Sequence, residues 1–167
     1  MAKKTIAKEA ALAEITLRRY EKPSFLEQPL EKALTENEPK KGQRELVRKL
    51  CLSIGLLQPG DSRDVIVDVL QVLLDAKKER KHMSSEAIKS NVIEYRKKNN
   101  LEVRGVADSN IRRQLKRLKD VFLVENINNE YRITEFSELD EIFEERIEKY
   151  YLQNILERVR EYFKAVK

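Results

Sequence analysis

The sequence has few of the residue types that build covalent, metal or redox sites. Its 167 residues include one cysteine (Cys51), one histidine (His82) and no tryptophan. A single cysteine excludes a disulfide within the chain, and the sequence has no Cys/His cluster with zinc-site spacing. Cys51 lies in an apolar stretch, where a buried thiol is expected rather than a reactive one. We expect no metal site and no cofactor.

Glycine is equally scarce. The four glycines are scattered, so the sequence contains neither a phosphate-binding loop nor a dinucleotide fingerprint. His82 ends the charged run 77–82, which is typical of a solvated linker rather than of a catalytic triad. We therefore expect that the protein is not an enzyme. No apolar run approaches the roughly 18 residues of a membrane span, and no signal peptide is recognisable, so we expect no membrane contact and a cytoplasmic protein.

Charge is abundant instead. Charged residues make up 38% of the chain and apolar residues 41%, with a net charge of +5. The apolar fraction is sufficient for a core. The richness in Lys, Arg and Glu suits long surface helices. It is also typical of proteins from hot environments, so a thermophilic, archaeal source is a second interpretation of the same composition. The basic excess alone does not identify a polyanionic partner, so its distribution along the chain must decide.

Residues 1–41 form an N-terminal arm with the weakest pattern. Residues 5–20 have helical spacing, but 14–20 equally fit a strand, and Pro23, Pro29 and Pro39 interrupt regular structure. We interpret 21–41 as an extended or loosely helical arm. A linker without function fits this segment as well.

From residue 42 the pattern predicts four helices. The first ends at a Gly55 cap, and the second follows an Asp61 or Ser62 cap with Asp64 in its first turn. The third begins at Ser84 or Ser85 with Ala87, Ile88, Val92 and Ile93 inward, and ends in the basic run 96–100. The fourth follows Gly105, is capped by Asp108 or Ser109, and has Ile111, Leu115 and Leu118 at core spacing.

Two strands and a long helix complete the prediction. The segments 122–124 and 131–134 flank Asn128-Asn129, which suits a tight turn because asparagine tolerates positive φ. The last helix runs from about 137 to 165, with apolar residues every fourth position from Leu139 to Phe163. The expected fold class is mainly α with a small two-stranded β-hairpin. Residues 42–135 form one domain and 136–167 the C-terminal helix.

The order of these elements over residues 61–135 resembles the winged helix-turn-helix of prokaryotic transcription regulators. The segment 109–119 (SNIRRQLKRLK) resembles their recognition helices, residues 131–134 the return strand of the wing, and 83–88 the start of the preceding helix. The loop between the last two helices is longer than usual, and Val121-Phe122 stands where a glycine is common. The resemblance implies a DNA-binding regulator with its recognition helix, about 109–120, in the major groove.

Charge segregation agrees with this interpretation. Residues 76–119 contain 14 Lys/Arg and 5 Asp/Glu, whereas residues 120–148 contain 2 and 10. A merely solubilising surface mixes its signs. The alternative is a solvated amphipathic helix. The expected DNA-binding residues lie on and around the recognition helix: Ser109, Asn110, Arg112, Arg113, Gln114, Lys116, Arg117 and Lys119, with Lys89, Lys97, Lys98, Arg104 and Arg132 as phosphate contacts.

The wing and the C-terminal helix complete the expectations. The wing tip 126–130 has no cation, so we expect the wing to be structural apart from Arg132. The C-terminal helix is too long to lie wholly on a small domain, which predicts a homodimer; the alternative is packing against N-terminal helices of the same chain. The leading hypothesis is a dimeric regulator that binds double-stranded DNA. The competing hypothesis is a winged-helix protein-interaction module in a transcription, replication or chromosome-maintenance assembly.

Overall fold

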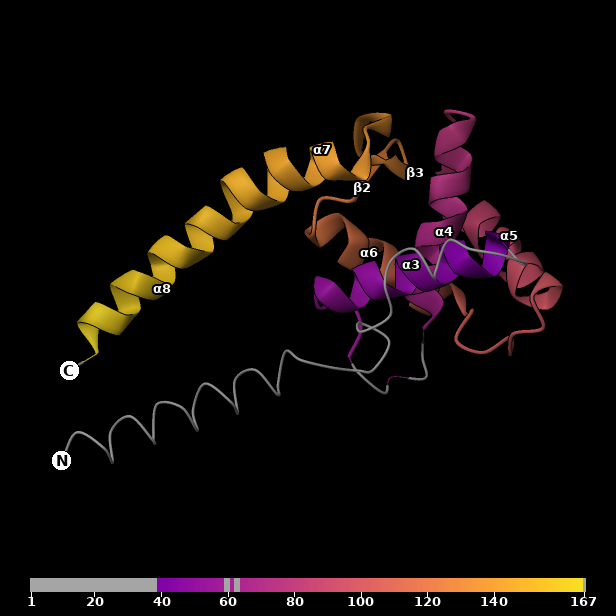
Figure 1. The fold of residues 1–167 in the computed structure, drawn as a ribbon. Helices are drawn as coiled ribbons and strands as arrows, with labels where there is room; N and C mark the ends of the chain where they lie inside the picture. Colours follow the sequence, from indigo (N-terminus) through magenta and orange to yellow (C-terminus); the bar gives the residue numbers. More distant parts are fainter. Residues whose placement is uncertain (1–38, 59–60, 62–63, 167) are drawn as a thin grey trace, which may run out of the picture. The chain divides into compact units, whose positions relative to one another are not determined.

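The structure, a computed structural model, describes residues 39–58, 61 and 64–166. The chain divides into two compact units, 1–49 and 50–167. The expectations for residues 1–38 lie outside the described residues. The second unit contains most of the elements, which are mainly helical with a small sheet (Figure 1).

The first described helix, α3 (Pro39–Ser53), spans the boundary between the units. It ends as the sequence predicts, at Gly55, whose φ of 76° is left-handed. The Gly55 N–H donates to the Leu52 carbonyl, and the Leu56 N–H donates to the Cys51 carbonyl over 2.8 Å. This pair of bonds is a Schellman cap, which satisfies the last carbonyls of the helix and turns Leu56 and Leu57 into the core.

Helix α4 (Val65–Lys78) is the centre of the second unit, in contact with α5, α6 and β3. Every residue from Val65 to Leu73 is buried, because this stretch is apolar on almost all sides. The expected cap at Asp61 or Ser62 is wrong: α4 begins after Asp64, which makes no side-chain capping bond. The Asp64 carboxylate instead pairs with Arg96 of the next helix.

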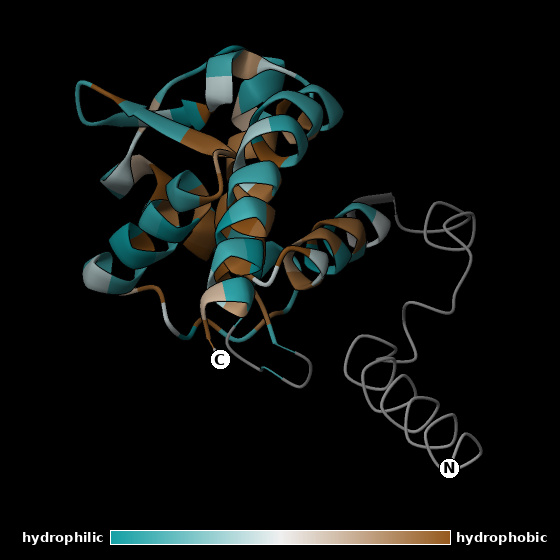
Figure 2. Cartoon of the chain, turned by 90° about the vertical axis from the view of Figure 1, so that its left-hand side faces the viewer, coloured by the Kyte–Doolittle hydropathy of each residue, from teal (hydrophilic) through white to brown (hydrophobic). Residues whose placement is uncertain are grey.

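Helices α5 (Ser85–Lys98) and α6 (Asp108–Asp120) pack on α4 and on each other. The expected start of α5 is confirmed, since the Ser84 hydroxyl accepts a bond from the Ala87 N–H. Ile88 and Val92 are buried as expected, but Ala87 is exposed and Ile93 only half-buried. Figure 2 shows hydrophilic and hydrophobic residues alternating in bands along the helices.

The sheet has three strands rather than the expected two. Strand β1 (Met83–Ser84) pairs antiparallel with β3 (Glu130–Ile133), which pairs with β2 (Val124–Ile127), so the order is β1-β3-β2. The two strands expected at 122–124 and 131–134 lie at 124–127 and 130–133. The predicted turn is confirmed, since Asn128 and Asn129 have φ of 53° and 65°, as the two central residues of a type I′ turn require. Phe122, at the position where a glycine is common, has φ of 64°.

The C-terminal helix follows a short 3-10 turn, η2 (Thr134–Phe136). It comprises α7 (Leu139–Ile142), a π-helical stretch η3 (Phe143–Leu152) and α8 (Gln153–Ala165), which confirms the predicted long helix. Figure 1 shows it extending away from the sheet. Ile142 and Ile147 are buried, whereas every residue of α8 is exposed.

The apolar repeat explains the π-helical stretch. Apolar residues recur every fourth position, from Leu139 to Phe163. An α-helix has 3.6 residues per turn, so a four-residue repeat drifts by about 40° at each step. The wider turns of a π-helix, with bonds from residue i to i+5, reverse that drift.

Candidate nucleic-acid interface

Helix α6 turns one side to the core and another to solvent. Ile111, Leu115 and Leu118 have no exposed surface, which confirms the three-and-four spacing read from the sequence. The helix begins after Ala107 rather than at a capping Asp108 or Ser109 side chain. The exposed residues of the helix are Asp108, Ser109, Arg112, Arg113, Lys116, Lys119 and Asp120.

Three cations on this exposed side are available to a ligand. Arg113, Lys116 and Lys119 make no ion pair with any residue that the structure describes. Arg112 approaches Glu86 of α5, with 3.3 Å between Nη2 and Oε1, but both side chains are more than half exposed and solvent screens the pair. Consecutive turns of α6 therefore present a basic face, defined here as Arg112, Arg113, Lys116 and Lys119.

One flank of α6 is occupied by hydrogen bonds within the fold. The Asn110 amide Nδ2 donates to the Gly105 carbonyl, and the Gln114 amide Nε2 donates to Asn110 Oδ1 over 2.8 Å. Arg117 donates from Nη1 to Gln114 Oε1 over 2.9 Å and from Nη2 to the Leu56 carbonyl. These three residues, which are among the expected DNA-binding residues, form a relay of hydrogen bonds that ties α6 to the loop before it and to the turn after α3.

The relay ends beside the buried Cys51. Burial raises the pKa of the Cys51 thiol to about 12, and the nearby Arg117 charge opposes part of that rise. The thiol is completely inaccessible, as the sequence predicted. A thiol in this state is a packing group, because only the thiolate is a nucleophile.

The expected phosphate contacts on α5 lie at its two ends. Near the beginning, Lys89 pairs with Asp108 of α6 over 2.9 Å and joins the two helices. At the end, Lys98 pairs with Glu94 over 2.6 Å, and this contact holds the pKa of Glu94 below its ordinary value. Lys97 is exposed and makes no ion pair among the described residues. Of these three lysines, Lys97 is the one that shares the state of Arg113, Lys116 and Lys119: it is exposed and has no ion-pair partner among the described residues.

Arg104 and Arg132 differ in how far their side chains are exposed to solvent. Arg104 is exposed and pairs with its neighbour Glu102. Arg132 is mostly covered: its Nε lies 2.6 Å from Glu125 on the facing strand, and its guanidinium stacks 4.7 Å from the Phe136 ring. Arg132 therefore stabilises the hairpin.

Arg96 shows that one cation of the basic segment is internal. It is 6% exposed, donates from Nε to the Glu102 carbonyl over 2.7 Å, and pairs through Nη1 with Asp64 and Asp68. Asp64 immediately precedes α4, and Asp68 lies in its first turn. The sequence shows Arg96 only as the first residue of the basic run 96–100, because nothing within α5 indicates that its partners lie about thirty positions earlier in the chain.

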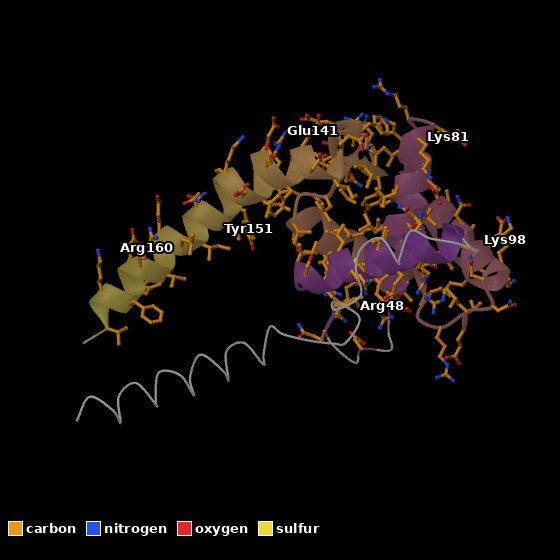
Figure 3. The ribbon with its side chains drawn as sticks, viewed as in Figure 1. Arg48, Lys81, Lys98, Glu141, Tyr151 and Arg160 are labelled. Atoms are coloured by element: carbon orange, nitrogen blue, oxygen red, sulfur yellow. The ribbon has the colours of Figure 1, made fainter. Side chains whose placement is uncertain are left out.

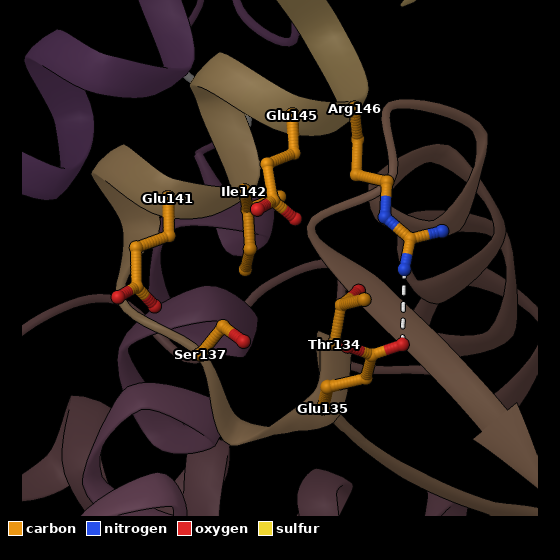
Figure 4. Close-up of a pocket in the computed structure, with 7 residues that line it drawn as sticks. All are labelled: Thr134, Glu135, Ser137, Glu141, Ile142, Glu145 and Arg146. Atoms are coloured by element: carbon orange, nitrogen blue, oxygen red, sulfur yellow. Dashed lines mark hydrogen bonds and ion pairs between the residues drawn. The ribbon is translucent and has the colours of Figure 1, made fainter.

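Other parts of the described surface offer less. A hollow of about 290 Å³ lies where η2 meets the C-terminal helix; three of its seven lining residues are glutamates, and Arg146 donates to Glu135 over 2.9 Å (Figure 4). Within the described ranges, no three His, Cys, Asp or Glu side chains are grouped to hold a metal ion. His82 is exposed and packs edge-on against Phe136. None of the described helices is long and apolar enough to cross a bilayer.

Comparisons with known proteins add no relative to this geometry. No protein-family model, no curated protein and no solved structure matches the chain.

Proposed function

We propose that the protein binds double-stranded DNA through the basic face of α6 and acts as a transcription regulator with a winged helix-turn-helix. The single observation that carries the proposal is the basic face itself. Four cations project from consecutive turns of a helix whose opposite side is fully buried. A rigid helix with outward cations has the width and charge to enter a major groove.

The arrangement of elements supports this interpretation. The described chain runs α4, β1, α5, α6, β2, β3, with β1 paired at the edge of the hairpin. A helix, short strand, two helices and a hairpin are the parts of a winged helix-turn-helix, and the additional strand β1 fits that architecture better than the two-stranded hairpin expected from the sequence. On this interpretation α6 is the recognition helix and the β2–β3 hairpin is the wing.

The division of roles along α6 follows from its hydrogen bonds. The relay from Asn110 to Arg117 holds the helix to its surroundings, so that its exposed side is presented in a fixed orientation. Arg113 is the cation best suited to a base edge, because its planar guanidinium can bond a guanine at two atoms. Lys116 and Lys119, as point charges, suit phosphates.

A binding titration tests the proposal. Fluorescence anisotropy of a labelled random-sequence duplex should be measured at several salt concentrations. The logarithm of the affinity should fall linearly with the logarithm of the salt concentration, with a slope of about −0.9 for each phosphate neutralised. Selection of bound duplexes from a random pool should then yield a preferred site. Absence of duplex binding at low salt would refute the proposal and favour a protein-interaction module.

A further inference from the structure

The end of the C-terminal helix has an apolar stripe that no described residue covers. Its side chains are between 39% and 82% exposed. A single helix of this length is marginal in water, and an uncovered apolar side does not stabilise it. The stripe therefore requires a partner surface. Its members are Leu152, Ile155, Leu156, Val159, Tyr162, Phe163 and Val166.

The stripe continues the core of the second unit. Tyr151, which immediately precedes it, packs edge-on against Phe122 with 5.7 Å between ring centroids. Figure 3 places Tyr151 on the C-terminal helix between Glu141 and Arg160. Apolar residues continue at every fourth position from Ile147 through Tyr151 and Ile155 to Val159. A partner on the stripe would thus extend an existing apolar surface rather than cover an isolated patch.

Residue types mirror each other about Val159. Arg158 and Arg160 flank it, then Glu157 and Glu161, then the apolar pairs 155–156 and 162–163. Two such helices related by a two-fold axis at Val159 run antiparallel, and each position then meets its mirror image. The large rings at 162–163 of one copy would lie against the smaller aliphatic residues at 155–156 of the other, with Val159 facing itself.

The pairing brings Arg158 and Arg160 near their like in the second copy, but helical spacing places both about 100° from Val159, so they flank the stripe and face solvent. Residues 152–166 contain three cations and two carboxylates, so two copies carry only a small like charge. Arg158 is already bonded to Glu161 over 3.2 Å within its own helix. Antiparallel helices also place opposite ends of their dipoles together.

We infer that α8 is a homodimer interface in which two copies pair antiparallel about Val159. The occupant of the stripe is a second copy of this chain. The inference goes beyond the proposed function and does not depend on it, because the interface lies on α8 and requires no nucleic acid.

The mass of the full chain in solution tests the inference. Without DNA, light scattering after chromatography should give twice the 19.7 kDa of one chain. Val159→Glu places two carboxylates face to face and should weaken association about 100-fold, which yields monomers at micromolar concentration. The control Asn154→Glu adds the same charge on another side of α8 and should remain dimeric. Circular dichroism of both variants verifies folding.

Cysteine cross-linking tests the orientation independently, and the native Cys51 is buried too deeply to interfere. Val159→Cys should link to itself with a short bifunctional thiol reagent. Leu152→Cys and Val166→Cys should link only when the two variants are mixed. Self-linking of each at 152 and 166 would overturn the antiparallel arrangement. A monomeric wild-type mass, with the stripe covered by residues 1–38 or by another protein, would overturn the interface, as would a dimer unaffected by Val159→Glu.

Discussion

Removal of the three unpaired cations of α6 is the most direct test of a nucleic-acid role. The variant Arg113→Gln/Lys116→Gln/Lys119→Gln changes side chains that are exposed and that have no ion-pair partner among the residues described. None of them contacts the core, so the fold should be retained and the melting temperature should change little. A loss of binding would then report on the surface rather than on stability.

The magnitude follows from counterion release. If all three cations neutralise phosphates, the slope of log affinity against log salt should become shallower by about 2.7, from about 0.9 for each contact. Over the range from about 50 to 200 mM salt, a slope difference of that size corresponds to about 40-fold in affinity. If Arg113 bonds a base instead, its contribution to the slope disappears and a loss of about 1–3 kcal/mol appears only on the preferred site.

The control removes the same charge elsewhere. Lys78→Gln/Arg80→Gln/Lys81→Gln, at the end of α4, lowers the formal net charge from +5 by the same three units. Anisotropy titrations of both triple variants at four salt concentrations separate a local contact from general attraction. Equal slopes for the two variants, or an unchanged slope in the α6 variant, would refute the assignment of DNA binding to the basic face.

Three further predictions concern the supports of this face. Arg96→Met removes the guanidinium that pairs with the buried carboxylates of Asp64 and Asp68 and should lower the free energy of unfolding by about 3–5 kcal/mol in urea titrations, against little change for the exposed Arg104→Met. In the folded protein the pKa of the Cys51 thiol is about 12, whereas in the unfolded chain it is near 9. Between these pH values the stability of the wild type should therefore fall by about 1.4 kcal/mol per pH unit more than that of Cys51→Ala. Parallel slopes of stability against pH in urea titrations of the two proteins would contradict the burial of the thiol. Gly105→Ala, at a φ of 71°, places a Cβ at 3.1 Å from Val65 and 3.3 Å from Asn110, whereas Gly55→Ala, at a φ of 76°, meets nothing within 4 Å. Both variants share a backbone strain of about 1–2 kcal/mol. Calorimetry should therefore show a larger loss of stability for Gly105→Ala than for Gly55→Ala.

The sequence by itself determined the features that depend on near neighbours. A left-handed turn requires residues that tolerate positive φ, and Asn128, Asn129 and Gly55 are such residues. The Ser84 cap depends on an N–H three positions away. The buried and exposed sides of α6 follow from helical spacing alone. For the same reason, helical spacing was sufficient to identify the exposed cations at 112, 113, 116 and 119.

Only the tertiary structure decided the features whose partners are distant in the chain. Strand β1 has two residues, too few for a periodic pattern, and it exists because Met83 pairs with Tyr131. The guanidinium of Arg96 is buried because two aspartates of α4 meet it there. Arg117 differs from Arg113 in role because a carbonyl of the turn after α3 lies within its reach. Spacing along a helix indicates which side a residue is on, but the groups that face that side come from elsewhere in the sequence, and only folding brings them together.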